Sequence, residues 1–194
     1  RYRVLAWEFR RQADFDFADL VEELGEGTAA EEPGTIAVVG ESFGGTVAMH
    51  YVLAYPERVG RLVLINTFPS YRWKIRISLA CRVSALLRWR GMRGVKSFIA
   101  ERILVHEGIL PEDRRRYHEI VGLIDPAAYR RRLELVRDSA LRERLGEITA
   151  PTLLLASGRD KIVPSVAEAR FMASRIPNAR LYEFPRAGHA LLLT

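Results

Sequence analysis

Ser42, which lies between glycines, is the residue of this 194-residue chain best placed to do chemistry. Residues 40–45 read Gly-Glu-Ser-Phe-Gly-Gly, after an apolar run and before a helical pattern. A Gly-x-Ser-x-Gly sequence in that setting predicts a tight strand-to-helix turn that exposes the serine hydroxyl. The positions two before and two after the serine must be small, and Gly40 and Gly44 meet that need. We interpret Ser42 as a nucleophile and the N–H of Phe43 as an oxyanion donor. The alternative is a glycine-rich turn with an incidental serine.

A serine hydroxyl is a weak nucleophile until a base takes its proton, so the histidines are the next candidates. The chain has four of them. His50 lies within the helix predicted after Ser42, and we interpret it as a packed or surface helix position. His106 and His118 lie in an arginine-rich segment and are typical of solvated positions. His189 follows the last predicted strand in a loop that can place an imidazole over the serine. We therefore predict that His189 is the general base.

An imidazole that acts as a base needs a carboxylate to orient it. Asp160 follows a buried strand directly, in the sequence Gly-Arg-Asp at 158–160. The rival position, at the end of the preceding strand, holds Asn66, which cannot supply a negative charge. The chain order Ser42, Asp160, His189 is the one expected for a nucleophile on a strand-to-helix turn. We predict Asp160 as the acid, although aspartate is also a common turn residue.

Strands that alternate with helices must position these side chains. Three of the predicted strands are continuous apolar runs, which are typical of strands buried on both faces of a parallel sheet. The predicted strands are residues 2–9, 35–39, 61–66, 151–156 and 180–184. The predicted helices around them are residues 14–24, 44–54 and 165–175. This alternation predicts an α/β fold with a mostly parallel sheet flanked by helices.

Residues 69–147 interrupt the alternation with a helical, arginine-rich pattern, which we interpret as an insertion over the sheet. All of the excess positive charge of the chain, +6 in total, lies in this segment. No nucleic-acid reading module is visible, so we expect no nucleic-acid partner. Residues 72–94 carry cations, no acid, and apolar side chains that include Trp73 and Trp89. We favour a helix whose apolar face covers the site. The alternative is weak contact with an anionic membrane surface.

Several classes of protein are excluded by composition. Hydrophobic residues make up 48% and charged residues 28%, which argues against disorder. A single cysteine, Cys81, excludes an internal disulfide framework and a cysteine-rich zinc module. The sequence has neither a transmembrane run nor the apolar core of a signal peptide, so we expect a cytoplasmic protein. The predicted chemistry calls for no metal and no organic cofactor.

The sequence resembles the α/β-hydrolase superfamily. The resemblance rests on residues 40–45, on Gly-Arg-Asp at 158–160, and on Gly-His at 188–189. It implies the α/β-hydrolase fold, with a nucleophile, an acid and a base at the three positions predicted above. It also implies a core formed by residues 1–69 and 148–194, and a helical cap over 70–147 that shapes the substrate pocket.

One departure from the family pattern concerns the start of the chain. Family members carry further strands and a His-Gly-type loop before the nucleophile, and that loop supplies the second oxyanion N–H. No His-Gly occurs before Ser42, and residues 2–9 resemble the strand that follows that loop. The helix that normally follows the catalytic histidine is also missing after His189. We therefore expect this chain to be an internal piece of a longer hydrolase, with the second oxyanion donor outside it.

Together these features predict a serine hydrolase of the carboxylesterase or lipase type. It would cleave an ester-type bond through an acyl-enzyme. The substrate would be a small hydrophobic molecule, because the apolar side chains of the predicted cap cover the site. An acyltransferase with the same triad remains an alternative, as does a non-catalytic member that binds a ligand. A membrane-surface lipase is a weaker alternative. The sequence leaves the substrate and the oligomeric state open.

Overall fold

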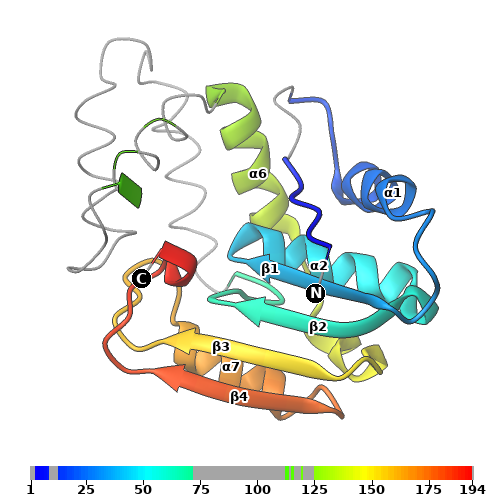
Figure 1. Ribbon diagram of the computed structural model, residues 1–194. Helices are drawn as coiled ribbons and strands as arrows, with labels where there is room; N and C mark the ends of the chain where they lie inside the picture. The colour runs from blue at the N-terminus through cyan, green and yellow to red at the C-terminus, as the bar shows by residue number, and fades with distance from the viewer. Residues whose placement is uncertain are drawn as a thin grey trace.

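The fold is built on a parallel sheet whose four described strands lie in chain order (Figure 1). The structure is a computed structural model that describes residues 3–8, 13–71 and 125–193, together with the single positions 112, 113, 115 and 119. The strands are β1 (Ile36–Glu41), β2 (Val59–Ile65), β3 (Thr152–Ser157) and β4 (Ala179–Phe184). Every neighbouring pair is parallel. The predicted parallel α/β sheet is therefore confirmed.

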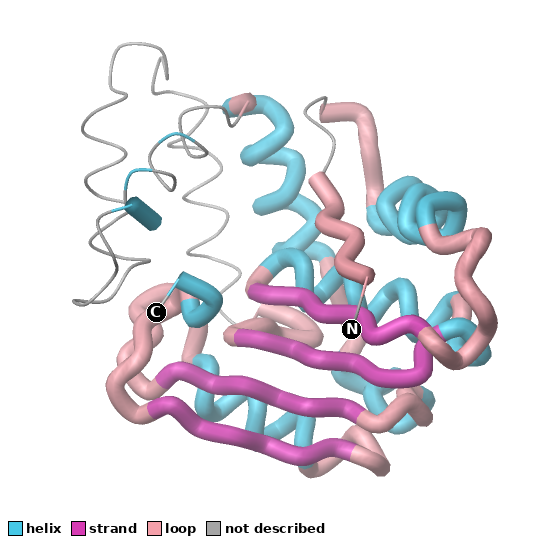
Figure 2. Tube along the Cα trace, in the orientation of Figure 1, coloured by secondary structure: helices cyan, strands magenta, loops and turns pink. Residues whose placement is uncertain are grey.

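Helices connect the strands and cover one face of the sheet (Figures 1 and 2). Helix α2 packs on β1 and β2, and helix α7 packs on β3 and β4. The helices are α1 (Phe17–Gly27), α2 (Phe43–Ala54), α6 (Pro126–Asp138) and α7 (Ser165–Ala173). Short 3-10 turns are η1 (Pro56–Arg58), η3 (Arg142–Glu147) and η4 (Leu191–Leu193). Because every pair is parallel, the carboxyl ends of the four described strands lie at one edge of the sheet.

Helix α1 begins where the sequence provides a cap. The Asp16 carboxylate accepts the N–H groups of Ala18 and Asp19, at 2.6 and 3.0 Å. The Asp19 carboxylate accepts the N–H of Asp16 at 2.7 Å in return. This reciprocal capping satisfies N–H groups that have no partner within the helix. It places the start of α1 at Phe17, three residues after the start predicted from apolar spacing.

The hydrophobic core lies between the sheet and its helices. Leu62, Leu64 and Leu154, from the two central strands, are at most 1% exposed. They form one cluster with Met49 of α2 and Met172 of α7. Alternate residues of a strand point to opposite faces, so these leucines mark the covered face.

The opposite face of the sheet corrects the expectation that the strands are buried on both sides. Val39 is 56% exposed, Leu153 38% and Tyr182 63%. Among the described residues, α2 and α7 pack on the face of Leu62 and Leu154. Val39, Leu153 and Tyr182 are therefore not covered by these two helices. An apolar strand predicts burial, but it does not specify which element covers each face.

The prediction of a strand at the start of the chain is wrong for the residues that the structure describes there. Residues 3–8 have no regular secondary structure. Val4 is 82% exposed and Leu5 is 50% exposed. A strand requires the backbone of a neighbour, and in the described sheet β1 pairs with β2 alone. Apolar composition by itself supplies no such neighbour.

The cap predicted over 70–147 stays a prediction, because residues 72–111 lie outside the described part of the chain. The same holds for Cys81, His106 and His118. Helix α6 falls within the predicted cap and agrees with the helical pattern expected there. None of the helices in the described residues has the length and apolar character needed to cross a bilayer.

His50 packs where α2 meets α1. Its ring stacks on Phe17, with 4.0 Å between centroids and 21° between planes. Its Nε2 is buried, without a hydrogen-bond partner among the described residues. Burial, and to a smaller extent the charge of Arg144, lowers the pKa of His50 to about 4. His50 is therefore a neutral, packed helix residue at neutral pH, as one of the two sequence interpretations held.

This burial predicts a pH-dependent loss of stability. Between about pH 6.5 and about pH 4, unfolded His50 binds a proton that the folded protein excludes. Stability should therefore fall as the pH drops through that range. His50→Gln removes the titrating ring. Over this pH range the free energy of unfolding of the wild type should fall by on the order of 1–2 kcal/mol relative to that of the variant. Urea unfolding of both proteins at several pH values measures this difference. A difference that stays the same at all pH values would contradict the prediction.

Two neighbouring leucines offer a test of the core. Leu154 is fully buried, whereas Leu153 is 38% exposed on the opposite face of the same strand. Leu154→Ala should lower the free energy of unfolding by about 2–5 kcal/mol, because it leaves a cavity in the core. Leu153→Ala is the matched control and should cost less than half as much. Urea unfolding measures both, and equal losses would show that the two faces are equally packed.

Candidate active site

Ser42 lies at the junction of β1 and α2, as the sequence predicts. Its backbone has φ 54° and ψ −121°, in a region that residues with side chains rarely adopt. Its N–H donates to the carbonyl of Ile65 at 2.9 Å, which ties the turn to the end of β2. A Cβ at position 40 would lie 2.5 Å from the carbonyl oxygen of Gly44. Gly40 is therefore required by the closeness of the two backbones, and Phe43 begins α2 with its N–H at the helix start.

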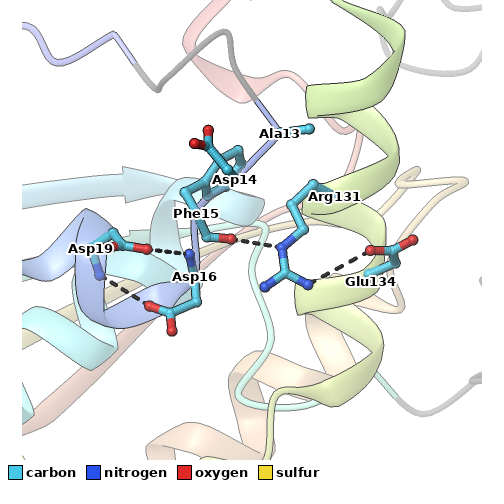
Figure 3. Close-up of a pocket in the computed structure, with 7 residues that line it drawn as sticks. All are labelled: Ala13, Asp14, Phe15, Asp16, Asp19, Arg131 and Glu134. Carbon is cyan, nitrogen blue, oxygen red and sulfur yellow. Dashed lines mark hydrogen bonds and ion pairs between the residues drawn. The ribbon is translucent and has the colours of Figure 1, made fainter.

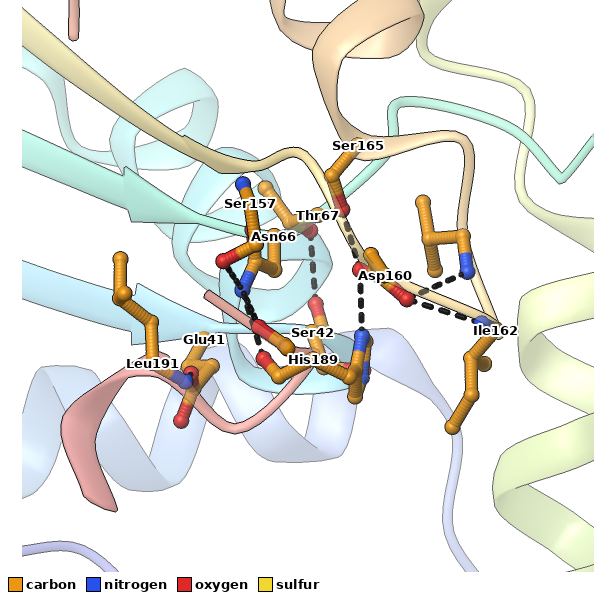
Figure 4. Close-up of polar contacts among 12 residues, drawn as sticks. Glu41, Ser42, Asn66, Thr67, Ser157, Asp160, Ile162, Ser165, His189 and Leu191 are labelled. Carbon is orange, nitrogen blue, oxygen red and sulfur yellow. Dashed lines mark hydrogen bonds and ion pairs between the residues drawn. The ribbon is translucent and has the colours of Figure 1, made fainter. Parts of the chain in front are cut away.

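The structure brings Ser42, His189 and Asp160 together (Figure 4). The Nε2 of His189 lies 2.9 Å from the Oγ of Ser42. The Nδ1 of His189 lies 2.7 Å from the Oδ2 of Asp160. The side chains of His189 and Asp160 are only 6% and 1% exposed. The three groups therefore form a continuous hydrogen-bonded chain that is largely shielded from water.

Asp160 is held as a carboxylate by its surroundings. Its Oδ1 accepts the N–H groups of Ile162 and Val163 at 2.8 and 3.0 Å. Its Oδ2 accepts from the hydroxyl of Ser165 as well as from His189. Burial alone would raise the pKa of Asp160, but His189, Ser165 and the N–H of Val163 outweigh it and lower the pKa below its usual value. The group facing the imidazole is therefore negatively charged at neutral pH.

Two further polar residues contact the loop that carries His189, and the sequence prediction assigned neither of them a role there. Asn66, at the end of β2, donates from Nδ2 to the carbonyl of His189 at 2.6 Å. Glu41, at the end of β1, accepts the N–H of Leu191 at 2.6 Å. Both are polar residues at the ends of strands, which is a weak signal but the one that could have identified them.

A surface hollow lies apart from these residues, between α6 and the segment before α1 (Figure 3). Its volume is about 430 Å³, and its lining comprises Ala13, Asp14, Phe15, Asp16, Asp19, Arg131 and Glu134. Arg131 donates to the carbonyl of Phe15 at 2.6 Å and pairs with Glu134 at 3.6 Å. Its lining includes none of the residues grouped around Ser42. We interpret the hollow as the place where α6 is tied to the start of α1.

Comparison with known proteins identifies relatives over most of the chain. Residues 11–193 match the family described as serine aminopeptidase, S33. A pimeloyl-[acyl-carrier protein] methyl ester esterase from Chromobacterium violaceum is 31% identical, over 91% of this chain and 70% of that protein. A putative carbamate hydrolase, RutD, from Serratia proteamaculans is 26% identical, over 93% of this chain and 68% of that protein.

Solved structures show the same fold. A hydrolase from Pseudomonas aeruginosa PA01 superposes with a TM-score of 0.78 at 25% identity, covering 91% of this chain and 66% of that one. MenH from S. aureus also gives 0.78, at 21% identity, covering 96% of this chain and 74% of that one. The chain thus spans roughly two thirds to three quarters of the length of these relatives. It belongs to the α/β-hydrolase superfamily and, within it, to the serine aminopeptidase S33 family of hydrolases.

Proposed function

We propose that this protein is a serine hydrolase that cleaves an ester-type bond through an acyl-enzyme. Ser42 is the nucleophile, His189 the general base and Asp160 the acid that orients it. The observation that carries the proposal is the hydrogen-bonded chain of these residues, with separations of 2.9 and 2.7 Å. Nucleophile, base and orienting carboxylate are the parts that acyl transfer needs.

The geometry suggests how each group acts. His189 takes the Ser42 proton at Nε2 while Oγ attacks the carbonyl carbon of the substrate. The negative oxygen that forms is stabilised by the N–H of Phe43, at the start of α2. The Asp160 carboxylate stabilises the imidazolium. His189 then returns the proton to the leaving group, and water releases the acyl group by the reverse sequence.

Support for an ester-type substrate comes from the relatives. The similar proteins from Chromobacterium violaceum and Nitrosomonas europaea are named as methyl ester esterases, at 31% and 30% identity. The relative from Serratia proteamaculans is named as a putative carbamate hydrolase. Both names describe cleavage at a carbonyl carbon. The apolar side chains of the predicted cap favour a small substrate with a hydrophobic acyl or alkyl group, and residues 70–147 would form its pocket.

Labelling with a fluorophosphonate probe tests the nucleophile. The probe should attach to Ser42, and peptide mapping should locate it there. Ser42→Ala should abolish labelling and reduce hydrolysis of p-nitrophenyl butyrate by about 10⁴-fold or more. Ser174→Ala is the control, because that hydroxyl lies on the exposed end of α7 and donates to Phe171. A folded wild type that neither reacts with the probe nor cleaves esters would instead indicate a ligand-binding protein.

Replacing the acid tests its role separately. Asp160→Asn preserves shape but removes the charge opposite His189, and an amide favours the wrong imidazole tautomer. The kcat for ester hydrolysis should fall by about 10⁴-fold. Circular dichroism and the urea midpoint show whether the variant is folded. A folded variant that retains more than a tenth of the wild-type kcat would remove Asp160 from the mechanism.

A further inference from the structure

The position of the His189 imidazole depends on the backbone of an irregular loop. His189 follows β4 and precedes the short turn η4, so no strand or long helix fixes its backbone. Its imidazole must nevertheless reach Ser42 on one side and Asp160 on the other, within hydrogen-bond distance of both. A displacement of about 1 Å at such a group can cost 10²-fold in rate. The contacts that hold the loop backbone are therefore of direct interest.

Asn66 provides the first of these contacts. Its Nδ2 donates to the carbonyl of His189 at 2.6 Å and is 3.3 Å from that of Gly188. The same amide bridges to β3, with Nδ2 donating to the Ser157 hydroxyl and Oδ1 accepting the Ser157 N–H, both at 2.8 Å. Asn66 is only 2% exposed, so these bonds form away from bulk water. A buried amide with both ends bonded is strongly fixed in orientation.

The backbone of Asn66 explains how its side chain reaches the loop. Its φ is 45°, in the left-handed region, which asparagine tolerates better than most residues. Its N–H still donates to the carbonyl of Leu155 at 3.0 Å, so the residue remains attached to β3 as it leaves β2. The turn aims the amide at the carbonyls that follow β4, as Figure 4 shows for Asn66 and His189.

Glu41 provides the second contact, from the other side of His189. Its Oε1 accepts the N–H of Leu191 at 2.6 Å. Burial raises the pKa of Glu41, and the N–H groups of Leu191 and Leu192 together with the charge of His189 partly offset that rise. Glu41 directly precedes Ser42, so it ties the chain beyond His189 to the strand that carries the serine.

We propose that Asn66 and Glu41 are positioning residues that anchor the His189 loop on both sides and so set the imidazole between Ser42 and Asp160. Asn66 fixes the carbonyl of His189 itself, and Glu41 fixes the N–H two residues later. Neither contact involves the imidazole or a substrate. The expected effect on the rate rests on the proposed function, whereas the expected effect on the position of the imidazole does not.

Two pairs of variants separate positioning from general packing. Asn66→Asp keeps the size but loses the donor, and it turns a carboxylate towards the carbonyls of the loop. Asn178→Asp is its control, because the Asn178 amide makes an equivalent bond to the Thr149 carbonyl at 3.1 Å on the surface. Glu41→Met removes the acceptor for Leu191, whereas Glu41→Gln keeps a carbonyl oxygen of the same reach and should rescue the effect.

Two readouts should be taken on the folded protein. The first is the downfield proton resonance of the His189–Asp160 hydrogen bond in NMR spectra. The second is kcat and KM for p-nitrophenyl butyrate. We expect Asn66→Asp and Glu41→Met to shift or broaden the resonance and to lower kcat by about 10–10²-fold with KM nearly unchanged. Asn178→Asp and Glu41→Gln should stay within about threefold of the wild type in kcat.

Each result bears on the proposal. An unchanged resonance and kcat in folded Asn66→Asp and Glu41→Met would overturn it. Equal losses in Asn178→Asp, or no rescue by Glu41→Gln, would also overturn it, because the effect would then be unspecific. If the wild type cleaves no ester but the resonance still responds to the two variants, the positioning role stands and the proposed function fails.

Discussion

The left-handed backbone at Ser42 has to be imposed by its surroundings, because a residue with a side chain does not favour it. β2 supplies one restraint, by accepting the serine N–H at the carbonyl of Ile65. The serine carbonyl is held by the hydroxyl of Thr67 at 2.6 Å and by the N–H groups of Gly45 and Thr46. The direction of the hydroxyl is therefore set by the joint between β1, α2 and β2. The imidazole of His189 meets the hydroxyl in that direction, with Nε2 2.9 Å from Oγ.

The three residues of the hydrogen-bonded chain could be predicted because each directly follows a strand or its turn. Parallel strands end at one edge, so Ser42, Asp160 and His189 were expected at the same edge of the sheet once the strands were identified. Asn66 could not be assigned in this way. Its contact with His189 joins positions 123 residues apart, and it depends on a backbone conformation that no local pattern specifies. The sequence supported only the statement that Asn66 lacks the charge of an acid.

The sequence predictions that were wrong share one physical cause. The apolar residues of 2–9 indicated a strand, and the apolar strands indicated burial on both faces. Residues 3–8 have no regular structure, and Val39 and Tyr182 are largely exposed. An apolar pattern indicates that burial of a segment is favourable, but it does not specify which other element covers that segment. The start of α1 depends on local contacts instead, because the Asp16 and Asp19 carboxylates accept backbone N–H groups only three residues away.

The chain order of the strands has a consequence for synthesis on the ribosome. Ser42 and His189 are 147 positions apart, and the sheet runs from β1 to β4 in the order in which the chain is made. Within this chain, the serine turn after β1 is made before its base, which follows β4. A nascent chain therefore carries the serine hydroxyl without the histidine that would activate it while the residues between the two are being made. Under the proposed mechanism, activation of the Ser42 hydroxyl by a histidine base therefore begins only after His189 has been made and the loop after β4 has folded against β1 and β2.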